Sequence, residues 1–272
     1  MYNILVAGLV ISLDLCYESD FVNSYKYKTE LDADYYISSR LVDDIKEPFG
    51  QLIYETKYYK KYDMNGHIIQ VQYLDGRLIG SIDYYKNSIM INITYHNSVS
   101  EYVMSQYGLS YILNKNDAII MHGSSIVYNN LGIMFTAKSG TGKSTHRGLW
   151  ERFSDAIVLN DDKNILRLEG NDVILYSSPW SGKHKLDNNI SHRLDAIVFL
   201  YQDKTNSIRR LKAMEGFKLM LSQIDFPNDD SKLLWDRITD RLLALPMYYL
   251  GCNMEKEAFD VCREMITKDL MD

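Results

Sequence analysis

Residues 135–145, Phe-Thr-Ala-Lys-Ser-Gly-Thr-Gly-Lys-Ser-Thr, contain the groups that could hold a phosphate. Small residues let several backbone N–H groups converge on one anion, and residues 138–142 fit this requirement. Lys143 would reach the β- and γ-phosphates, while Ser144 would ligate Mg²⁺ at a helix N-terminus. The spacing departs from G-x-x-x-x-G-K-[ST] only at Ala137, where alanine replaces the first glycine. The predicted nucleotide-binding residues are Ala137, Lys138, Ser139, Gly140, Thr141, Gly142, Lys143, Ser144 and Thr145.

Two adjacent carboxylates follow a hydrophobic segment at residues 156–159. A Mg²⁺–nucleotide site uses a carboxylate at the end of a strand beside the phosphate loop, and we assign this metal role to Asp161. Asp162 could then act as general base on an incoming hydroxyl. Neighbouring carboxylates can exchange these roles, and a solvated Asp-Asp turn is the alternative. His122, in Met-His-Gly-Ser-Ser, precedes the loop and would assist the base.

This ordered set of His122-Gly, phosphate loop and Asp161-Asp162 resembles the C-terminal kinase domain of the HPr kinase/phosphorylase family and, more distantly, phosphoenolpyruvate carboxykinase. The likeness spans roughly residues 117–180. It looks greatest for the shorter HPr-kinase-like proteins, some of which phosphorylate a serine of a peptide precursor. The resemblance implies a P-loop kinase core that uses ATP and Mg²⁺, with catalytic roles for His122, Asp161 and Asp162. It also implies that Ser-Ser-Pro-Trp-Ser-Gly-Lys lies near the acceptor, which gives the substrate residues Trp180, Ser181, Gly182 and Lys183.

Two features of the chain differ from the family pattern. The Glu-Ile-Arg-Gly-like signature loop that HPr kinases carry after the paired acids is absent, so HPr is not the expected substrate. The N-terminal half does not match the regulatory domain of that family. This half could be an acceptor-recognition sheet or a dimerisation surface, and a homo-oligomer therefore stays open.

The surrounding residues predict the elements that must position the set. Residues 50–96 alternate apolar and polar side chains between the turn signals Asn65-Gly66, Asp75-Gly76 and Lys86-Asn87, which predicts an antiparallel meander. We expect one buried strand near the N-terminus, a helix within residues 98–116, and one strand over residues 117–128. Further strands then alternate with helices at about 144–153, 231–244 and from about 256.

The expected fold class is therefore α/β, with a P-loop kinase core of HPr kinase C-terminal type over residues 99–272. An antiparallel β-rich extension precedes it over residues 1–98.

Composition narrows the class of protein. The 272 residues carry a net charge of −6, which argues against a general nucleic-acid binder. Three cysteines without C-x-x-C spacing favour neither a disulfide framework nor a zinc site, so a cytoplasmic location is expected. Asp14 interrupts the N-terminal apolar run before it reaches the ~20 residues of a membrane helix, and no membrane partner is expected.

Together these features predict an ATP-dependent kinase that phosphorylates a hydroxyl, with a serine of a peptide or protein as the expected acceptor. Two alternatives stay open at this point. One is a kinase of small molecules, and the other is a nucleotide-binding regulatory ATPase that phosphorylates nothing.

Overall fold

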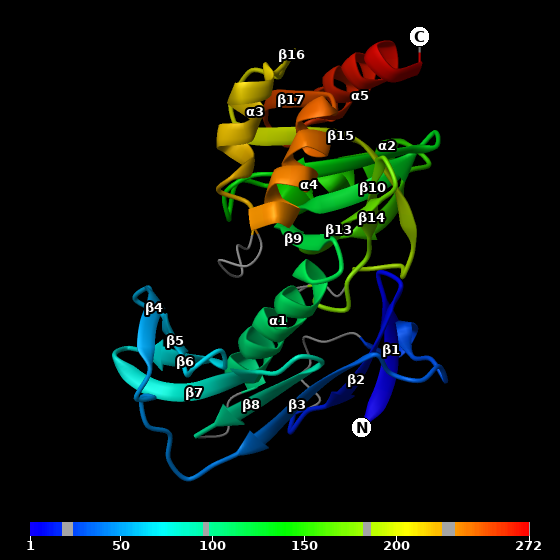
Figure 1. Ribbon diagram of the computed structural model, residues 1–272. Helices are drawn as coiled ribbons and strands as arrows, with labels where there is room; N and C mark the ends of the chain where they lie inside the picture. The colour runs from blue at the N-terminus through cyan, green and yellow to red at the C-terminus, as the bar shows by residue number, and fades with distance from the viewer. Residues whose placement is uncertain (18–23, 95–97, 182–185, 225–231, 272) are drawn as a thin grey trace. The chain divides into compact units, whose positions relative to one another are not determined.

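The computed structural model describes residues 1–17, 24–94, 98–181, 186–224 and 232–271 (Figure 1). By its internal contacts the chain divides into two compact units, Met1–Ile112 and Leu113–Asp272. The sequence-based boundary at residue 98 coincides with the first residue of helix α1 (Ser98–Asn114), whereas the contacts place nearly all of this helix in the first unit. No helix within the described ranges is long and apolar enough to span a membrane.

The described part of the first unit contains a sheet of eight strands in the order β1-β2-β3-β8-β7-β6-β5-β4. The predicted meander is confirmed, because β4 to β8 pair antiparallel with their neighbours in sequence. β3 instead pairs in parallel with both β2 and β8. The elements are β1 (Tyr2–Val6), β2 (Leu9–Asp14), the 3-10 helix η1 (Ser24–Tyr27), β3 (Tyr35–Leu41), β4 (Gln51–Glu55), β5 (Tyr59–Asp63), β6 (Ile68–Leu74), β7 (Arg77–Tyr84) and β8 (Ser88–Ile93).

The N-terminal apolar run forms a hairpin, so the prediction of one strand there is wrong. Ala7 and Gly8 both have positive φ, at 49° and 75°, and this turn folds β2 back onto β1. Helix α1 packs closely on the sheet where glycine leaves room. A Cβ at Gly80 would lie 2.6 Å from the side chain of Met104, and one at Gly108 would lie 2.9 Å from Ile89.

The second unit combines strands and helices, as expected for an α/β protein, but not in strict alternation, because several strands follow one another directly. Its strands are β9 (Ala118–His122), β10 (Ser124–Tyr128), β11 (Leu131–Thr136), β12 (Ile157–Asn160), β13 (Lys163–Glu169), β14 (Asp172–Tyr176), β15 (Ser191–Gln202), β16 (Ser207–Arg210) and β17 (Met247–Cys252). Its helices are α2 (Lys143–Phe153), α3 (Ala213–Met220), α4 (Lys232–Ala244) and α5 (Lys256–Met271). The helices expected near residues 144, 231 and 256 are confirmed within one residue at their starts.

Twelve-residue β15 is the centre of this second sheet. It pairs in parallel with β11 on one side and with β17 on the other, while its first residues also pair antiparallel with β14. Successive side chains therefore face opposite layers. Met134 and Phe199 belong to the core cluster that includes α3 and α4, whereas Phe135 and Val198 belong to the cluster that includes α2 and α5. Helices cover both faces of the sheet (Figure 1).

The segment predicted as one strand over residues 117–128 is two strands, and Gly123 is the break. β9 pairs with β13, whereas β10 pairs with β11 and β12. A Cβ at Gly123 would lie 2.6 Å from the carbonyl oxygen of Phe135, so only glycine lets the chain pass this point without displacement. The break leaves His122 at the end of β9, beside the residues that follow β12.

Candidate functional site

The Gly-rich loop, residues 137–142, connects β11 to α2. Gly140 and Gly142 have φ of 79° and 110°, and Gly142 is the N-cap of α2. At Gly140 a Cβ would meet no atom within 4 Å, so glycine is required there by the backbone conformation and not by space. Left-handed residues within such a turn direct neighbouring N–H groups to one side, which makes a concavity suited to an anion. The predicted strand–loop–helix arrangement is present.

Lys143 folds back over this loop. Its Nζ donates to the carbonyl oxygens of Ala137, at 3.0 Å, and Lys138, at 3.5 Å. Burial lowers the pKa of Lys143, and the charges of Asp162 and Asp161 oppose that shift. The amine thus lies between loop carbonyls and carboxylates, where a phosphate would give it a charged acceptor. Ser144 is partly buried in the first turn of α2, and Thr145 is exposed.

Asp161 lies inside the protein. Its side chain is 2% exposed, and its Oδ1 accepts from Arg147 Nε at 2.9 Å and from the Ser124 hydroxyl at 2.8 Å. Arg147 also contacts Glu151 one turn further along α2. This carboxylate therefore ties the end of β12 to both α2 and β10, and in this conformation it has little surface to offer a metal ion.

Asp162 faces the other way and meets the predicted histidine. Its Oδ1 lies 2.7 Å from His122 Nδ1, and the two side chains are 26% and 27% exposed. Burial would raise the pKa of Asp162, but the contact with His122 and the charges of Lys163 and Lys143 outweigh it, and the pKa is lowered. Asp162 is thus an ionised, solvent-accessible carboxylate close to the lysine of the Gly-rich loop.

Backbone pairing explains why these residues meet. His122 is opposite Lys163 in the ladder between β9 and β13, and Gly123 N–H donates to the Asp162 carbonyl at 2.9 Å. The His122 N–H in turn donates to the carbonyl of Gln223 at 2.8 Å, and the Thr136 hydroxyl donates to the carbonyl of His122 at 2.7 Å. The strand before the loop, the histidine and the acids are therefore held by one hydrogen-bonded network.

Sequence reasoning missed Arg147 and Gln223. Arg147 lies four residues after Lys143, on the same side of the helix, where two cations repel each other unless a carboxylate is near. The four-residue spacing of Lys143 and Arg147 could therefore have indicated a carboxylate that pairs with Arg147. Gln223 carries no such signal, because only the fold brings it to His122.

The substrate residues predicted downstream are placed only in part. Trp180 is fully buried and Ser181 is 1% exposed, so neither presents surface to an acceptor in this conformation. Gly182 and Lys183 lie outside the described residues. A role for this segment in acceptor binding stays a prediction.

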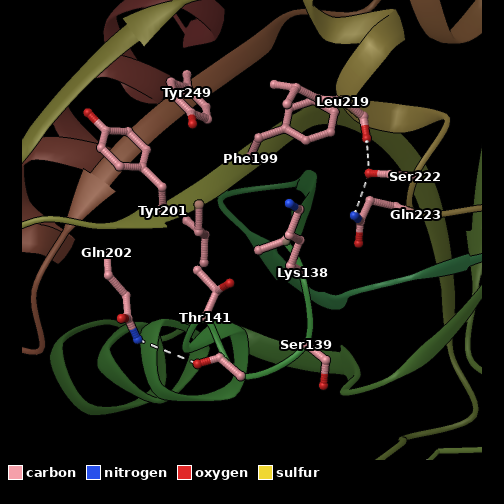
Figure 2. Close-up of a pocket in the computed structure, with 13 residues that line it drawn as sticks. Lys138, Ser139, Thr141, Phe199, Tyr201, Gln202, Leu219, Ser222, Gln223 and Tyr249 are labelled. Atoms are coloured by element: carbon pink, nitrogen blue, oxygen red, sulfur yellow. Dashed lines mark hydrogen bonds between the residues drawn. The ribbon is translucent and has the colours of Figure 1, made fainter.

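Two cavities border the Gly-rich loop. The first, of about 510 Å³, we call the Tyr249 pocket; it is lined by Lys138, Gly140, Tyr201, Leu219, Gln223 and Tyr249, among others (Figure 2). Its Tyr201 and Tyr249 rings stack with centroids 4.4 Å apart. The second, of about 820 Å³, we call the Asn253 cavity; it is lined by Gly142, Thr145, His146, Lys204, Asn253 and Met254, among others.

The structure shows no cluster of side chains that would form a complete metal-binding site among the described residues. No group of three or more His, Cys, Asp or Glu side chains that could hold a metal occurs among the residues the structure describes. Mg²⁺ in nucleotide sites is usually held by one or two protein oxygens together with phosphates and waters. The Ser144 hydroxyl and the Asp162 carboxylate fit that sparse requirement, and the enclosed Asp161 fits it less well.

No family model and no curated protein matches the chain. Among solved structures, the HPr(Ser) kinase/phosphatase from Coxiella burnetii is similar to it, at 13% sequence identity. The similarity covers 55% of this chain and 97% of that chain, with a TM-score of 0.35. This is a distant structural relationship, and it assigns no role to any residue of the chain.

Proposed function

We propose that the second unit is an ATP-dependent, Mg²⁺-requiring kinase that phosphorylates a hydroxyl, with a serine of a peptide or protein as the acceptor. The observation that carries the proposal is the ionised Asp162, in contact with His122 and close to the Lys143 amine at the Gly-rich loop. A site that only bound a nucleotide would need the loop and the lysine but not the paired base.

The loop amides and Lys143 would hold the β- and γ-phosphates. Ser144, together with phosphate oxygens and waters, would hold Mg²⁺, which when bound neutralises charge that develops on the phosphate oxygens. The acceptor oxygen bonds to the γ-phosphorus as the bond to the β–γ bridging oxygen breaks, and ADP leaves with that electron pair. The hydroxyl proton passes to Asp162, with His122 orienting the carboxylate.

The lowered pKa of Asp162 makes it a weak base, but it keeps the carboxylate charged throughout the neutral range. Phosphoryl transfer usually passes through a loose transition state in which little proton transfer is needed early. The position of the Asp162 carboxylate therefore matters more for catalysis than its basicity. Asp161 would act through Arg147, by fixing α2 and the loop that precedes it.

An exposed strand edge in the first unit supports a peptide acceptor. All five residues of β4 are exposed, including Leu52 at 45% and Tyr54 at 48%, and within the described sheet β4 pairs only with β5. An extended peptide can add to such an edge through main-chain hydrogen bonds. A small-molecule acceptor would make no use of it.

The test is mass spectrometry of a peptide library and of cell metabolites after incubation with Mg-ATP. Phosphoserine on a peptide, lost in Asp162→Asn by about 10²–10⁴-fold, is the expected result. Phosphate found only on a metabolite would establish the small-molecule kinase, and ATP hydrolysis without a phosphorylated product would establish the regulatory ATPase. Lys143→Ala, which should abolish Mg-ATP binding in calorimetry, is the control for the site itself.

A further inference from the structure

The two cavities beside the Gly-rich loop share one wall. Gly140, Thr141 and Gln202 line both of them, and the Gln202 side chain lies 3.5 Å from the Gly140 carbonyl (Figure 2). A phosphate chain on the loop therefore has a cavity on each side. A kinase needs two such spaces, because the attacking and leaving oxygens lie in line on opposite sides of the transferred phosphorus.

We propose that the Asn253 cavity takes the nucleoside of the nucleotide and that the Tyr249 pocket takes the acceptor. This inference rests on the proposed function and extends it, because it states from which side of the loop each substrate enters.

The position of the acid–base pair decides which cavity receives the acceptor. Gln223 lines the Tyr249 pocket, and its carbonyl accepts the His122 N–H at 2.8 Å. The Thr136 hydroxyl also joins these two residues, at 2.7 Å from the His122 carbonyl and 3.4 Å from Gln223 Oε1. His122, which contacts the base Asp162, is thus one backbone hydrogen bond from the wall of the Tyr249 pocket. The Asn253 cavity has no such link among the contacts that the structure describes.

The Asn253 cavity is built from the elements that commonly surround a nucleoside. It lies where the parallel strands β15 and β17 end, at the start of the helix that follows the loop, and ligands of α/β sheets bind at the carboxyl ends of strands. Its loops are held in place by their own hydrogen bonds. Asn253 Nδ2 donates to the Lys204 carbonyl at 3.3 Å, and Asp203 N–H donates to the Cys252 carbonyl at 3.1 Å.

Two side chains of this cavity bear on what it could bind. Met254 is 74% exposed, and its thioether could lie against the flat face of a base. His146 is 2% exposed, and its Nε2 accepts from Trp150 Nε1 at 3.2 Å, so in the neutral ring the proton is on Nδ1. That Nδ1 has no hydrogen-bond partner among the described residues. Nδ1 itself is enclosed in the protein, so Met254 is the side chain through which this cavity can contact a base.

The experiment measures binding of Mg-ADP and of Mg-tripolyphosphate, which lacks the nucleoside, by calorimetry. Met254→Ala should weaken Mg-ADP binding by up to about tenfold and leave tripolyphosphate binding unchanged, because the contact between the thioether and the base is lost. Met214→Ala is the matched control, because Met214 is a 62% exposed methionine that lines neither cavity. Leu219→Ala and Tyr201→Leu, in the Tyr249 pocket, should change neither affinity.

Photolabelling with 8-azido-ATP tests the same proposal in the unaltered protein. Label located by fragment-ion sequencing to residues 252–254 supports it, and label on Tyr249 or on residues 219–223 overturns it. Loss of Mg-ADP affinity in Leu219→Ala or Tyr201→Leu with Met254→Ala unaffected would also overturn it. If the wild-type protein binds Mg-tripolyphosphate as tightly as Mg-ADP, the phosphate-binding role of the loop is supported and the nucleoside-binding role of the Asn253 cavity is refuted. If it binds neither, the proposed function fails as well.

Discussion

Replacing Asp161 with asparagine should destabilise the second unit, because the change removes one partner of a buried ion pair. Arg147 and Asp161 have side chains only 7% and 2% exposed. Removing one member of such a pair typically costs ~3–5 kcal/mol, since the other charge stays buried without compensation. Arg147 keeps its contact with Glu151, which is 44% exposed, so we expect a loss near the lower end, about 3 kcal/mol. For a unit of this size, that is a fall in Tm of roughly 6–12 °C.

Urea unfolding followed by tryptophan fluorescence measures this loss. Trp150 and Trp180 are both fully buried in the second unit and report its unfolding. Asp162→Asn is the matched control, because its side chain is 26% exposed and its loss should cost at most about 1 kcal/mol. In a double-mutant cycle with Arg147→Met, the combined variant should be more stable than the sum of the single losses by ~0.5–3 kcal/mol.

A role of Asp161 in binding the metal predicts a different result. If Asp161→Asn unfolds at the wild-type urea concentration and instead raises the Mg²⁺ needed for half-maximal ATP hydrolysis, Asp161 is a metal ligand. The first assignment from the sequence, with Asp161 on the metal and Asp162 as base, would then stand.

Three further variants test other parts of the structure. His122→Asn should raise the pKa of Asp162, and so move the acid limb of the rate profile to higher pH; an unmoved limb would exclude the pair. The stability that Asp162 contributes is fully present above its unfolded pKa of ~3.9 and is lost as pH falls through the lower folded pKa, so this contribution to the melting temperature should not vary with pH near 7 and should decline only in acid. Gly142→Ala places a side chain at a φ of 110°, which should destabilise by ~1–3 kcal/mol and weaken Mg-ATP binding; unchanged melting and affinity would show that the loop adapts. Glu101→Ala should lower the stability of the first unit by ~1–3 kcal/mol or more, because this buried carboxylate accepts from the Ser39 hydroxyl and from two backbone N–H groups; a neutral effect in urea titration would contradict it.

Local patterns were enough to predict most elements, and they failed where long-range pairing decides the outcome. The turns at Asn65-Gly66 and Asp75-Gly76 were predicted from residue type, and all four residues do have positive φ. By contrast, nothing local shows that β3 pairs in parallel with β2 and β8, since this depends on a crossover. The break at Gly123 was missed for the same reason, because the carbonyl of Phe135 that crowds it comes from another strand.

The sequence indicates which candidate residues lie in one region, but it does not indicate their geometry. A short motif shows that Lys143 and Gly142 belong to one loop, and sequence order places the two acids nearby. Which carboxylate is enclosed depends on the strand twist after Asn160 and on Arg147, and neither can be read from spacing. The same limit applies to Trp180, which was predicted to lie near the acceptor and whose side chain is fully buried in the structure.

The position of β15 also affects how the protein is made. Phe135 of β11 pairs with Val198 of β15, and Val198 pairs with Tyr248 of β17, so the sheet under the Gly-rich loop closes only when the last strand arrives. At ~5–20 residues per second, the ribosome needs on the order of 10 s between β11 and β17. During that interval the apolar strand β15 has no partner on the side that β17 later occupies. Parallel pairings between distant segments also form slowly. The nascent chain should therefore depend on chaperones, and nucleotide should protect it from proteolysis only after Cys252 has left the exit tunnel.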